Sequence, residues 1–144
     1  MVPNSLENNV IFLADKFSHL FHHALTVAFK TNRIPVTVEQ FSILALLFYK
    51  NGINQQEISV LLNRDKTTVA RVIVNMEKNK LILRMTDRND NRGKLIYLTD
   101  QGELAQKKAV ACSGKLYYKA MKNIKIADLK KSLMVMTRML RNIQ

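Results

Sequence analysis

The chain has 144 residues, of which 47% are hydrophobic and 24% charged, the composition of one ordinary globular domain. Its single cysteine excludes an intramolecular disulfide, and one cysteine with three histidines is a poor supply of zinc ligands. The formal net charge of +12 favours a polyanionic partner such as nucleic acid, although residues 99–144 carry +7 of it.

The N-terminus lacks the pattern of a secretory signal, and no apolar run in the sequence is long enough to span a bilayer. We therefore expect a cytoplasmic protein that makes no membrane contact. No phosphate-binding glycine loop and no set of nucleophile, base and orienting residue stands out, so we do not expect an enzyme.

Narrow apolar stripes are predicted on helices at both ends of the chain. After a capping pattern at residues 4–7, apolar side chains recur at steps of three and four over residues 6–24 and again over residues 126–143. Such stripes pack against other helices, either within one chain or, as we expect here, in a homodimer. Residues 1–34 and 99–144 are therefore predicted to be dimerisation helices.

Three shorter helices are predicted in the middle of the chain. Capping patterns at Thr37 and Asn54 start the first two, and Asn51-Gly52 ends the first, because glycine accepts the left-handed conformation. The third begins at or near Asp65 and has an apolar face that continues to Met76.

A β-hairpin is predicted after these helices. Residues 81–86 and 94–98 are short β-rich runs joined by a turn-forming stretch, and Thr99 caps the helix that follows. Helix, turn, helix and hairpin in this order form a winged helix-turn-helix over residues 37–98. The predicted fold is thus a single domain, mainly α with a small β-hairpin wing, in which dimerisation helices flank the winged helix-turn-helix.

This arrangement carries the chemistry needed to bind double-stranded DNA. A helix fits the major groove, and a basic hairpin can follow the phosphate backbone or enter the minor groove. Small hydroxyls permit close approach, and long cations reach phosphates or guanine. The predicted DNA-binding residues are Gln55, Gln56, Lys66, Thr67, Thr68, Arg71, Arg88, Asn89, Asn91, Arg92 and Lys94. Arg84, which lies on a strand, is expected to support the wing instead.

Residues 37–102 resemble the MarR (multiple antibiotic resistance regulator) family of bacterial transcription factors. The resemblance is carried in order by residues 37–44, 65–71 and 76–78, by Leu81-Ile82, Arg84, Asp87, Asp90 and Arg92, and by Leu98-Thr99 and Gly102. It implies that Arg92 enters the minor groove with Asp90 orienting its guanidinium, and that Arg71 anchors in the major groove. It further implies a repressor that binds a pseudo-palindromic operator as a homodimer and is released by a small-molecule effector.

The sequence departs from the family pattern at three positions. Lys80 stands where glycine is usual, so we expect Asn79 to take the left-handed conformation that ends the preceding helix. Asn75 and Asn91 stand where arginines are frequent, which lowers the positive charge of the surface that would face DNA.

Three further features of the sequence have alternative interpretations. Phe17, Phe21, His22 and Phe41 are candidates for lining an effector pocket, but a plain core explains the aromatic residues equally well. His19 and His23 have the spacing of metal ligands, yet two ligands do not make a site, and no metal or cofactor is expected. Cys112 lies on an apolar helical stripe and is interpreted as a core thiol.

A different class of function is compatible with the same fold. A winged helix can serve as a module that binds a protein partner and no DNA. Salt dependence separates the two hypotheses, because DNA binding through several cations weakens steeply as salt rises, whereas a mainly apolar protein interface changes little.

Overall fold

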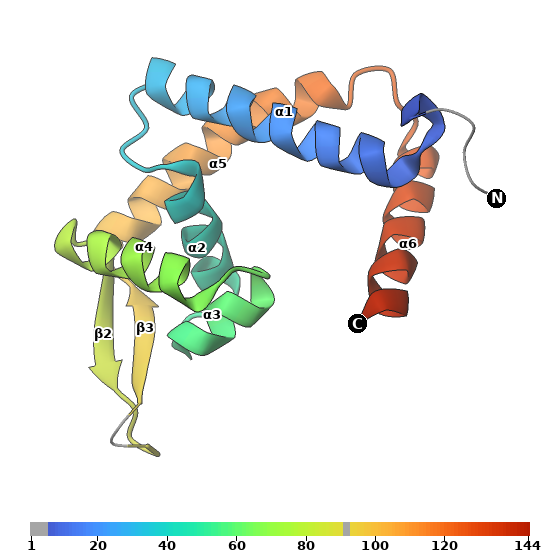
Figure 1. Cartoon of the computed structure of the whole chain (residues 1–144). Helices are drawn as coiled ribbons and strands as arrows, with labels where there is room; N and C mark the ends of the chain where they lie inside the picture. The colour runs from blue at the N-terminus through green and yellow to red at the C-terminus, as the bar shows by residue number, and fades with distance from the viewer. Residues whose placement is uncertain (1–5, 91–92) are drawn as a thin grey trace. The chain divides into compact units, whose positions relative to one another are not determined.

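The computed structural model describes residues 6–90 and 93–144, and the chain divides into two compact units, residues 1–113 and 114–144 (Figure 1). The helices are η1 (Leu6–Asn8), α1 (Val10–Thr31), α2 (Val38–Tyr49), α3 (Gln55–Leu61), α4 (Lys66–Lys78), α5 (Asp100–Ala120) and α6 (Ile126–Ile143). The strands are β1 (Ile53–Asn54), β2 (Ile82–Thr86) and β3 (Lys94–Leu98). The mainly α fold with a β-hairpin is confirmed.

The first long helix begins later than the sequence predicted. The expected cap includes Asn4 and Ser5, which lie outside the described residues, but the helix itself starts at Val10 after the short η1. Asn9 is the cap, because its side-chain oxygen accepts hydrogen bonds from the backbone N–H groups of Ile11 at 2.9 Å and Phe12 at 3.2 Å.

Local side-chain caps fix the starts of the central helices, as predicted. The Thr37 hydroxyl accepts from the Gln40 N–H at 3.2 Å, while the Gln40 side chain accepts from the Thr37 N–H at 3.0 Å. Asn54 and Glu57 form the equivalent pair at the start of α3. Each pair satisfies two backbone N–H groups, one of the cap residue and one three residues later. The two helices therefore begin where the sequence indicates.

The wing belongs to a three-stranded antiparallel sheet of order β1-β3-β2, not to a hairpin alone. Strands β2 and β3 pair from Ile82 opposite Leu98 to Thr86 opposite Lys94, as the predicted runs require. The two-residue β1, which was not predicted, adds Ile53 opposite Ile96 on the other edge of β3. The sheet therefore joins the start of α3 to the wing.

One apolar core unites the helix-turn-helix and the sheet. The largest fully buried side chains come from α2, α3, α4, β2 and β3, and they are Leu44, Leu47, Ile58, Ile73, Met76, Ile82 and Ile96. Helix α2 contacts α1, α4 and β3, so it lies at the centre of this core. Burial of these side chains holds α4 and the wing in a fixed mutual position.

Helix α4 ends through Lys80, and the prediction that Asn79 would be left-handed is wrong. Asn79 has an ordinary φ of −85°, whereas Lys80 has φ 57°. The Leu81 N–H donates to the Met76 carbonyl and the Lys80 N–H to the Glu77 carbonyl, both at 2.9 Å, which is a Schellman ending. Because Leu81 and Met76 are both buried, the apolar contact of this motif puts Lys80, not Asn79, in the left-handed position.

Lys80→Gly is expected to stabilise the protein, because a left-handed lysine carries a steric cost of about 1 kcal/mol that glycine avoids. Asn79→Gly is the matched control and should destabilise, since it removes the Asn79 hydrogen bond to Asn75 without relieving strain. Urea unfolding of the three proteins at one protomer concentration measures both effects. Equal gains for both variants would contradict the assignment of the left-handed residue.

The second unit comprises the C-terminal part of α5, a turn and α6. Helix α6 carries an apolar stripe that includes Leu133, Leu140 and Ile143, and no residue of this helix is buried in the chain. The positions of α6 outside this stripe include Lys130 and Lys131. Among the described residues, no helix combines the length and apolar character needed to cross a membrane.

Candidate nucleic-acid interface

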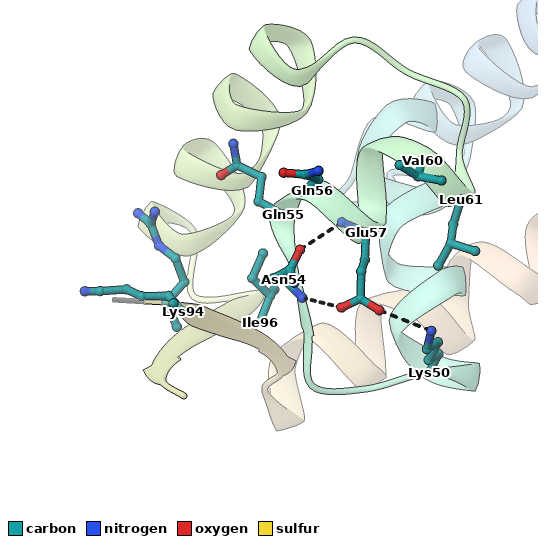
Figure 2. Close-up of a pocket in the computed structure, with 11 residues that line it drawn as sticks. Lys50, Asn54, Gln55, Gln56, Glu57, Val60, Leu61, Lys94 and Ile96 are labelled. Carbon is teal, nitrogen blue, oxygen red and sulfur yellow. Dashed lines mark hydrogen bonds and ion pairs between the residues drawn. The ribbon is translucent and has the colours of Figure 1, made fainter. Parts of the chain in front are cut away.

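A groove with both polar and apolar lining residues lies between α3 and the wing. It has a volume of about 710 Å³ and is lined from the helix by Gln55 and Gln56 and from the sheet by Arg84 and Lys94. In Figure 2, the Lys94 side chain extends from the wing strand away from α3, whereas Gln55 extends from the start of α3 in front of the neighbouring helix. The structure thus brings together two α3 residues and one wing residue that the sequence predicted as DNA contacts.

Helix α4 presents a polar face opposite its buried one. Val69, Ile73 and Met76 are buried, while Lys66 and Arg71 are exposed. Thr67 is exposed and Thr68 half-buried in the first turn. This division leaves cations and hydroxyls facing solvent along a helix of about 20 Å, long enough to lie in a major groove.

Asp65 caps α4, as predicted. Its carboxylate accepts from the Thr68 N–H at 2.8 Å. Hydrogen bonds from the Thr68 side chain and from the backbone N–H groups of Thr68 and Thr67 lower the pKa of Asp65, so the cap stays ionised near neutral pH. The capped first turn fixes the direction in which Lys66 and Thr67 leave the helix.

The tip of the wing is only partly described. Arg88 and Asn89 are exposed, and the turn is closed by backbone hydrogen bonds from Asp87 to Gly93 and from Gly93 to Asp90, both 2.9 Å. Asn91 and Arg92, both predicted DNA contacts, lie outside the described residues. The expected orientation of Arg92 by Asp90 therefore stays a prediction.

Arg84 supports the wing, as the sequence indicated. Its Nε donates to Glu77 Oε2 of α4 at 2.9 Å, and its Nη2 makes a second, shorter contact with the same oxygen. This hydrogen bond and the charge of Arg84 lower the pKa of Glu77, and the carboxylate in turn raises the pKa of Arg84. The pair ties β2 to the last turns of α4.

Glu77→Gln should therefore weaken folding in a pH-dependent way. A carboxyl whose folded-state pKa is lowered contributes stability above its ordinary pKa and loses that contribution as the pH falls through the folded-state value. Since the Arg84 and Glu77 side chains are 30% and 38% exposed, solvent screens the pair, and we expect a loss of no more than about 1 kcal/mol at pH 7.

The measurement is urea unfolding of wild type and Glu77→Gln between pH 7 and pH 3. The difference should shrink as the pH falls toward 3, because protonation of Glu77 removes its charge. Glu103→Gln is the control, because Glu103 pairs with Lys107 on the exposed side of α5 and should matter by only about 0.3 kcal/mol. A difference that persisted unchanged at pH 3 would contradict the role given to the Glu77 charge.

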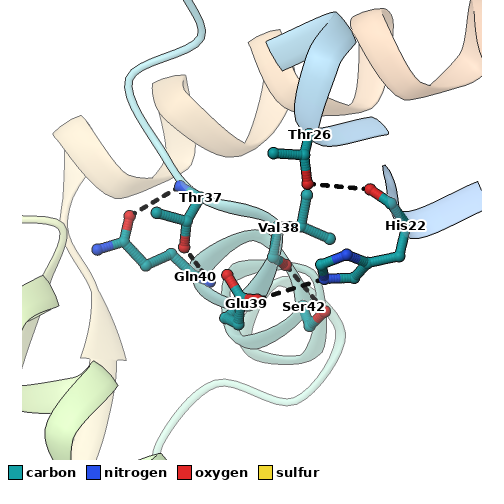
Figure 3. A network of polar contacts seen from close by, with 7 residues as sticks. All are labelled: His22, Thr26, Thr37, Val38, Glu39, Gln40 and Ser42. Atoms are coloured by element: carbon teal, nitrogen blue, oxygen red, sulfur yellow. Dashed lines mark hydrogen bonds and ion pairs between the residues drawn. The ribbon is translucent and has the colours of Figure 1, made fainter. Parts of the chain in front are cut away.

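The four candidate effector-pocket residues take part in separate contacts. Phe17 and Phe21 stack on α1 with ring centroids 5.7 Å apart, and Phe41 meets Phe29 edge-on at 5.5 Å. His22 Nε2 lies 3.3 Å from Glu39 Oε1 and so joins α1 to α2, as Figure 3 shows. A pocket lined by all four residues stays a prediction.

The remaining chemically notable side chains have structural partners. His19 Nδ1 lies 3.0 Å from the Asp15 carbonyl oxygen and 3.3 Å from its carboxylate. Over residues 6–90 and 93–144, no three histidine, cysteine or acidic side chains are grouped as a metal site would need. Cys112 is buried and free, beside Ala109 on the inner face of α5, as expected of a core thiol.

Sequence reasoning missed the side chains that link elements far apart in the chain. Gln40 of α2 donates to Asn75 of α4 at 2.7 Å, and Glu77 pairs with Arg84. Lys50, 3.3 Å from Glu57, lines the groove beside α3. No local pattern identifies such partners, because each is adjacent only after the chain has folded.

Comparison with known proteins agrees with this architecture. The MarR family model matches residues 36–94. The HTH-type transcriptional regulator TtmR of Methylorubrum extorquens is 28% identical over 100 residues, which are 69% of this chain and 50% of the relative, so the chain spans half of that relative's length. The organic hydroperoxide resistance transcriptional regulator of Bacillus subtilis is 30% identical over 111 residues, covering 76% of this chain and 73% of the relative.

A solved structure extends the likeness to nearly the whole chain. The MepR protein of S. aureus, crystallised as a DNA complex, superposes with a TM-score of 0.82 and 25% identity, covering 97% of this chain and 100% of MepR. The matched segment contains the helix-turn-helix and β2, and the superposition includes the terminal helices. The chain therefore belongs to the MarR family of winged-helix transcriptional regulators.

Proposed function

We propose that this protein is a transcriptional regulator that binds double-stranded DNA as a homodimer. The observation that carries the proposal is the juxtaposition of α4 and the wing. Lys66, Thr67 and Arg71 are exposed on α4, which contacts β2 of the wing, and Lys94 is exposed on β3. Helix and wing can therefore engage neighbouring parts of one duplex. That MepR was crystallised with DNA supports the same geometry.

The proposed contacts divide by element. Thr67, Thr68 and Arg71 approach base edges in the major groove, whereas Lys66, Gln55 and Gln56 contact the phosphate backbone. Lys94, Arg88 and Asn89 bring the wing to the sugar–phosphate backbone, and Asn91 and Arg92 are assigned to its tip from the family resemblance.

The dimer rests on the apolar surface that one chain leaves exposed. Phe17 and Leu20 of α1 are 52% and 60% exposed, and Leu133 and Ile143 of α6 are 67% and 83% exposed. Such a surface on two amphipathic helices is stabilised when a second copy covers it. A two-fold dimer then predicts a pseudo-palindromic operator whose half-sites are centred about 10 bp apart.

A small molecule that releases the protein from DNA is proposed from the family resemblance. Such a ligand must bind one spacing of the two DNA-binding heads better than the other, because equal affinity shifts no equilibrium. Phe17, Phe21, His22 and Phe41 remain the proposed lining, and the outcome proposed for DNA binding is repression.

The experiment is selection of bound fragments from random duplex DNA at low ionic strength. Sequencing should recover a symmetric site, and sedimentation should show two protomers per bound duplex. If the folded protein retains no duplex above background, the proposal fails and the protein-interaction hypothesis takes its place.

A further inference from the structure

Apolar packing and one pair of amides hold α4 against α2. Helix α4 packs against α2, α3 and β2, and its buried apolar side chains are Val69, Ile73 and Met76. The polar part is the hydrogen bond from Gln40 Nε2 of α2 to Asn75 Oδ1 of α4, 2.7 Å long. Apolar contacts have no preferred direction, whereas a hydrogen bond of this length restricts both distance and angle. The amide pair therefore restricts rotation of α4 that the apolar contacts alone would permit.

Both ends of the Gln40 amide are engaged. The side chain is only 7% exposed, and its oxygen accepts from the Thr37 N–H at 3.0 Å in the capping box (Figure 3). With the oxygen committed to Thr37, the nitrogen is left to point at α4. A buried amide that lost its partner would be unsatisfied, which opposes any rotation of α4 that carries Asn75 away.

Asn75 lies on the part of α4 that faces DNA in the proposed complex. It is one helical turn after Arg71 and two turns after Thr68, so the three residues share one side of the helix. Its Oδ1 also accepts from Asn79 Nδ2 at 3.0 Å, which adds a second constraint. Fixing the direction of Asn75 therefore fixes the direction in which Arg71 and Thr68 leave the helix.

We propose that Gln40 and Asn75 are positioning residues that set the rotation of α4 and thereby the sequence preference of this protein, without Gln40 touching DNA. The inference rests on the proposed function of α4 in reading the major groove. The family resemblance suggests an arginine at position 75. The asparagine found here lacks that charge, and its hydrogen bond to Gln40 fixes the orientation of α4 instead. Binding to phosphates, which needs charge more than orientation, should depend on the pair much less than discrimination between bases does.

The test is a double-mutant cycle with Gln40→Met, Asn75→Leu and the double variant, since both replacements keep side-chain size while removing the hydrogen bond. The probes are the duplex enriched by selection and a duplex of the same composition in shuffled order. Each single variant should lose about tenfold in preference for the enriched duplex, and the salt dependence of binding to the shuffled duplex should stay unchanged. The double variant should lose no more than either single one, because all three remove the same bond.

Thr37→Ala is the matched control. It removes the other half of the same capping box but leaves the Gln40–Asn75 bond in place, so it should lower the urea midpoint and keep the duplex preference. Equal losses on both duplexes, or full preference in Gln40→Met and Asn75→Leu, would overturn the inference while leaving the proposed function standing. A wild-type protein that bound no duplex would instead overturn the proposed function, and the inference with it.

Discussion

Gly102→Ala is expected to lower the free energy of unfolding by about 3 kcal/mol, the upper part of the range for overpacking a fixed site. A Cβ at this position would lie well inside contact distance of the Leu81 carbonyl oxygen and 2.9 Å from its carbonyl carbon. Both are backbone atoms of a buried residue, so no side-chain rotation can relieve the clash. The first turn of α5 would have to move away from the turn between α4 and β2.

Gly114→Ala provides the control on the same helix. A Cβ there meets no atom of the chain within 4 Å, so the variant should gain about 0.5–1 kcal/mol from the higher helix propensity of alanine. Urea unfolding followed by circular dichroism gives both values, at one protomer concentration because dimerisation contributes to stability. If Gly102→Ala were as stable as wild type, α5 could not approach Leu81 as closely as described.

The second large effect is the salt dependence of DNA binding. Lys66, Arg88 and Lys94 are described on the proposed DNA-binding surface and are assigned to the DNA backbone, which gives about six phosphate-reaching cations in a dimer and predicts a loss of at least ~10³-fold in affinity between 50 and 200 mM salt. The loss arises because counterions released from DNA on binding are harder to release into concentrated salt. Fluorescence anisotropy with the enriched duplex measures it, and an affinity that barely changed would favour a protein-binding module.

Single variants measure how much each residue contributes to the salt dependence of DNA binding. Lys66→Ala should reduce the slope of log affinity against log salt by about one for each protomer, whereas Arg71→Ala should also relax base preference at one position at a cost of about 1–3 kcal/mol. Arg138→Ala removes the same charge from α6 and should leave duplex preference intact. An Arg138 variant that behaved like Arg71→Ala would mean that net charge, not placement, governs binding.

Local chemistry explains which parts of the fold were predictable. Thr37, Asn54 and Asp65 mark helix starts because each cap is completed within three residues, and two short β-rich runs joined by a turn-forming stretch located β2 and β3. The late start of α1 and the left-handed Lys80 were not predicted. The capping pattern at residues 4–7 and Asn9 compete to start α1, whereas Asn79 and Lys80 compete for the left-handed position, where burial of Leu81 decides the outcome.

The candidate site was predictable in part for the same reason. The polar face of α4 follows from its periodicity, and Arg84 was correctly expected to support the wing. The partner of Arg84 was not predictable, since Glu77 is adjacent to it only after β2 folds back along α4. The amide pair of Gln40 and Asn75 spans 35 residues and leaves no local pattern at all.

The two-residue strand β1 has a mechanical consequence. Asn54 both pairs with Leu95 of β3 and caps α3, so a pull on the wing is transmitted through main-chain hydrogen bonds to the helix-turn-helix. The helix-turn-helix and the wing of each protomer should consequently move as one rigid body. A duplex with a groove of unsuitable width must then either deform itself or be rejected, because β1 ties strand β3 of the wing to the start of α3.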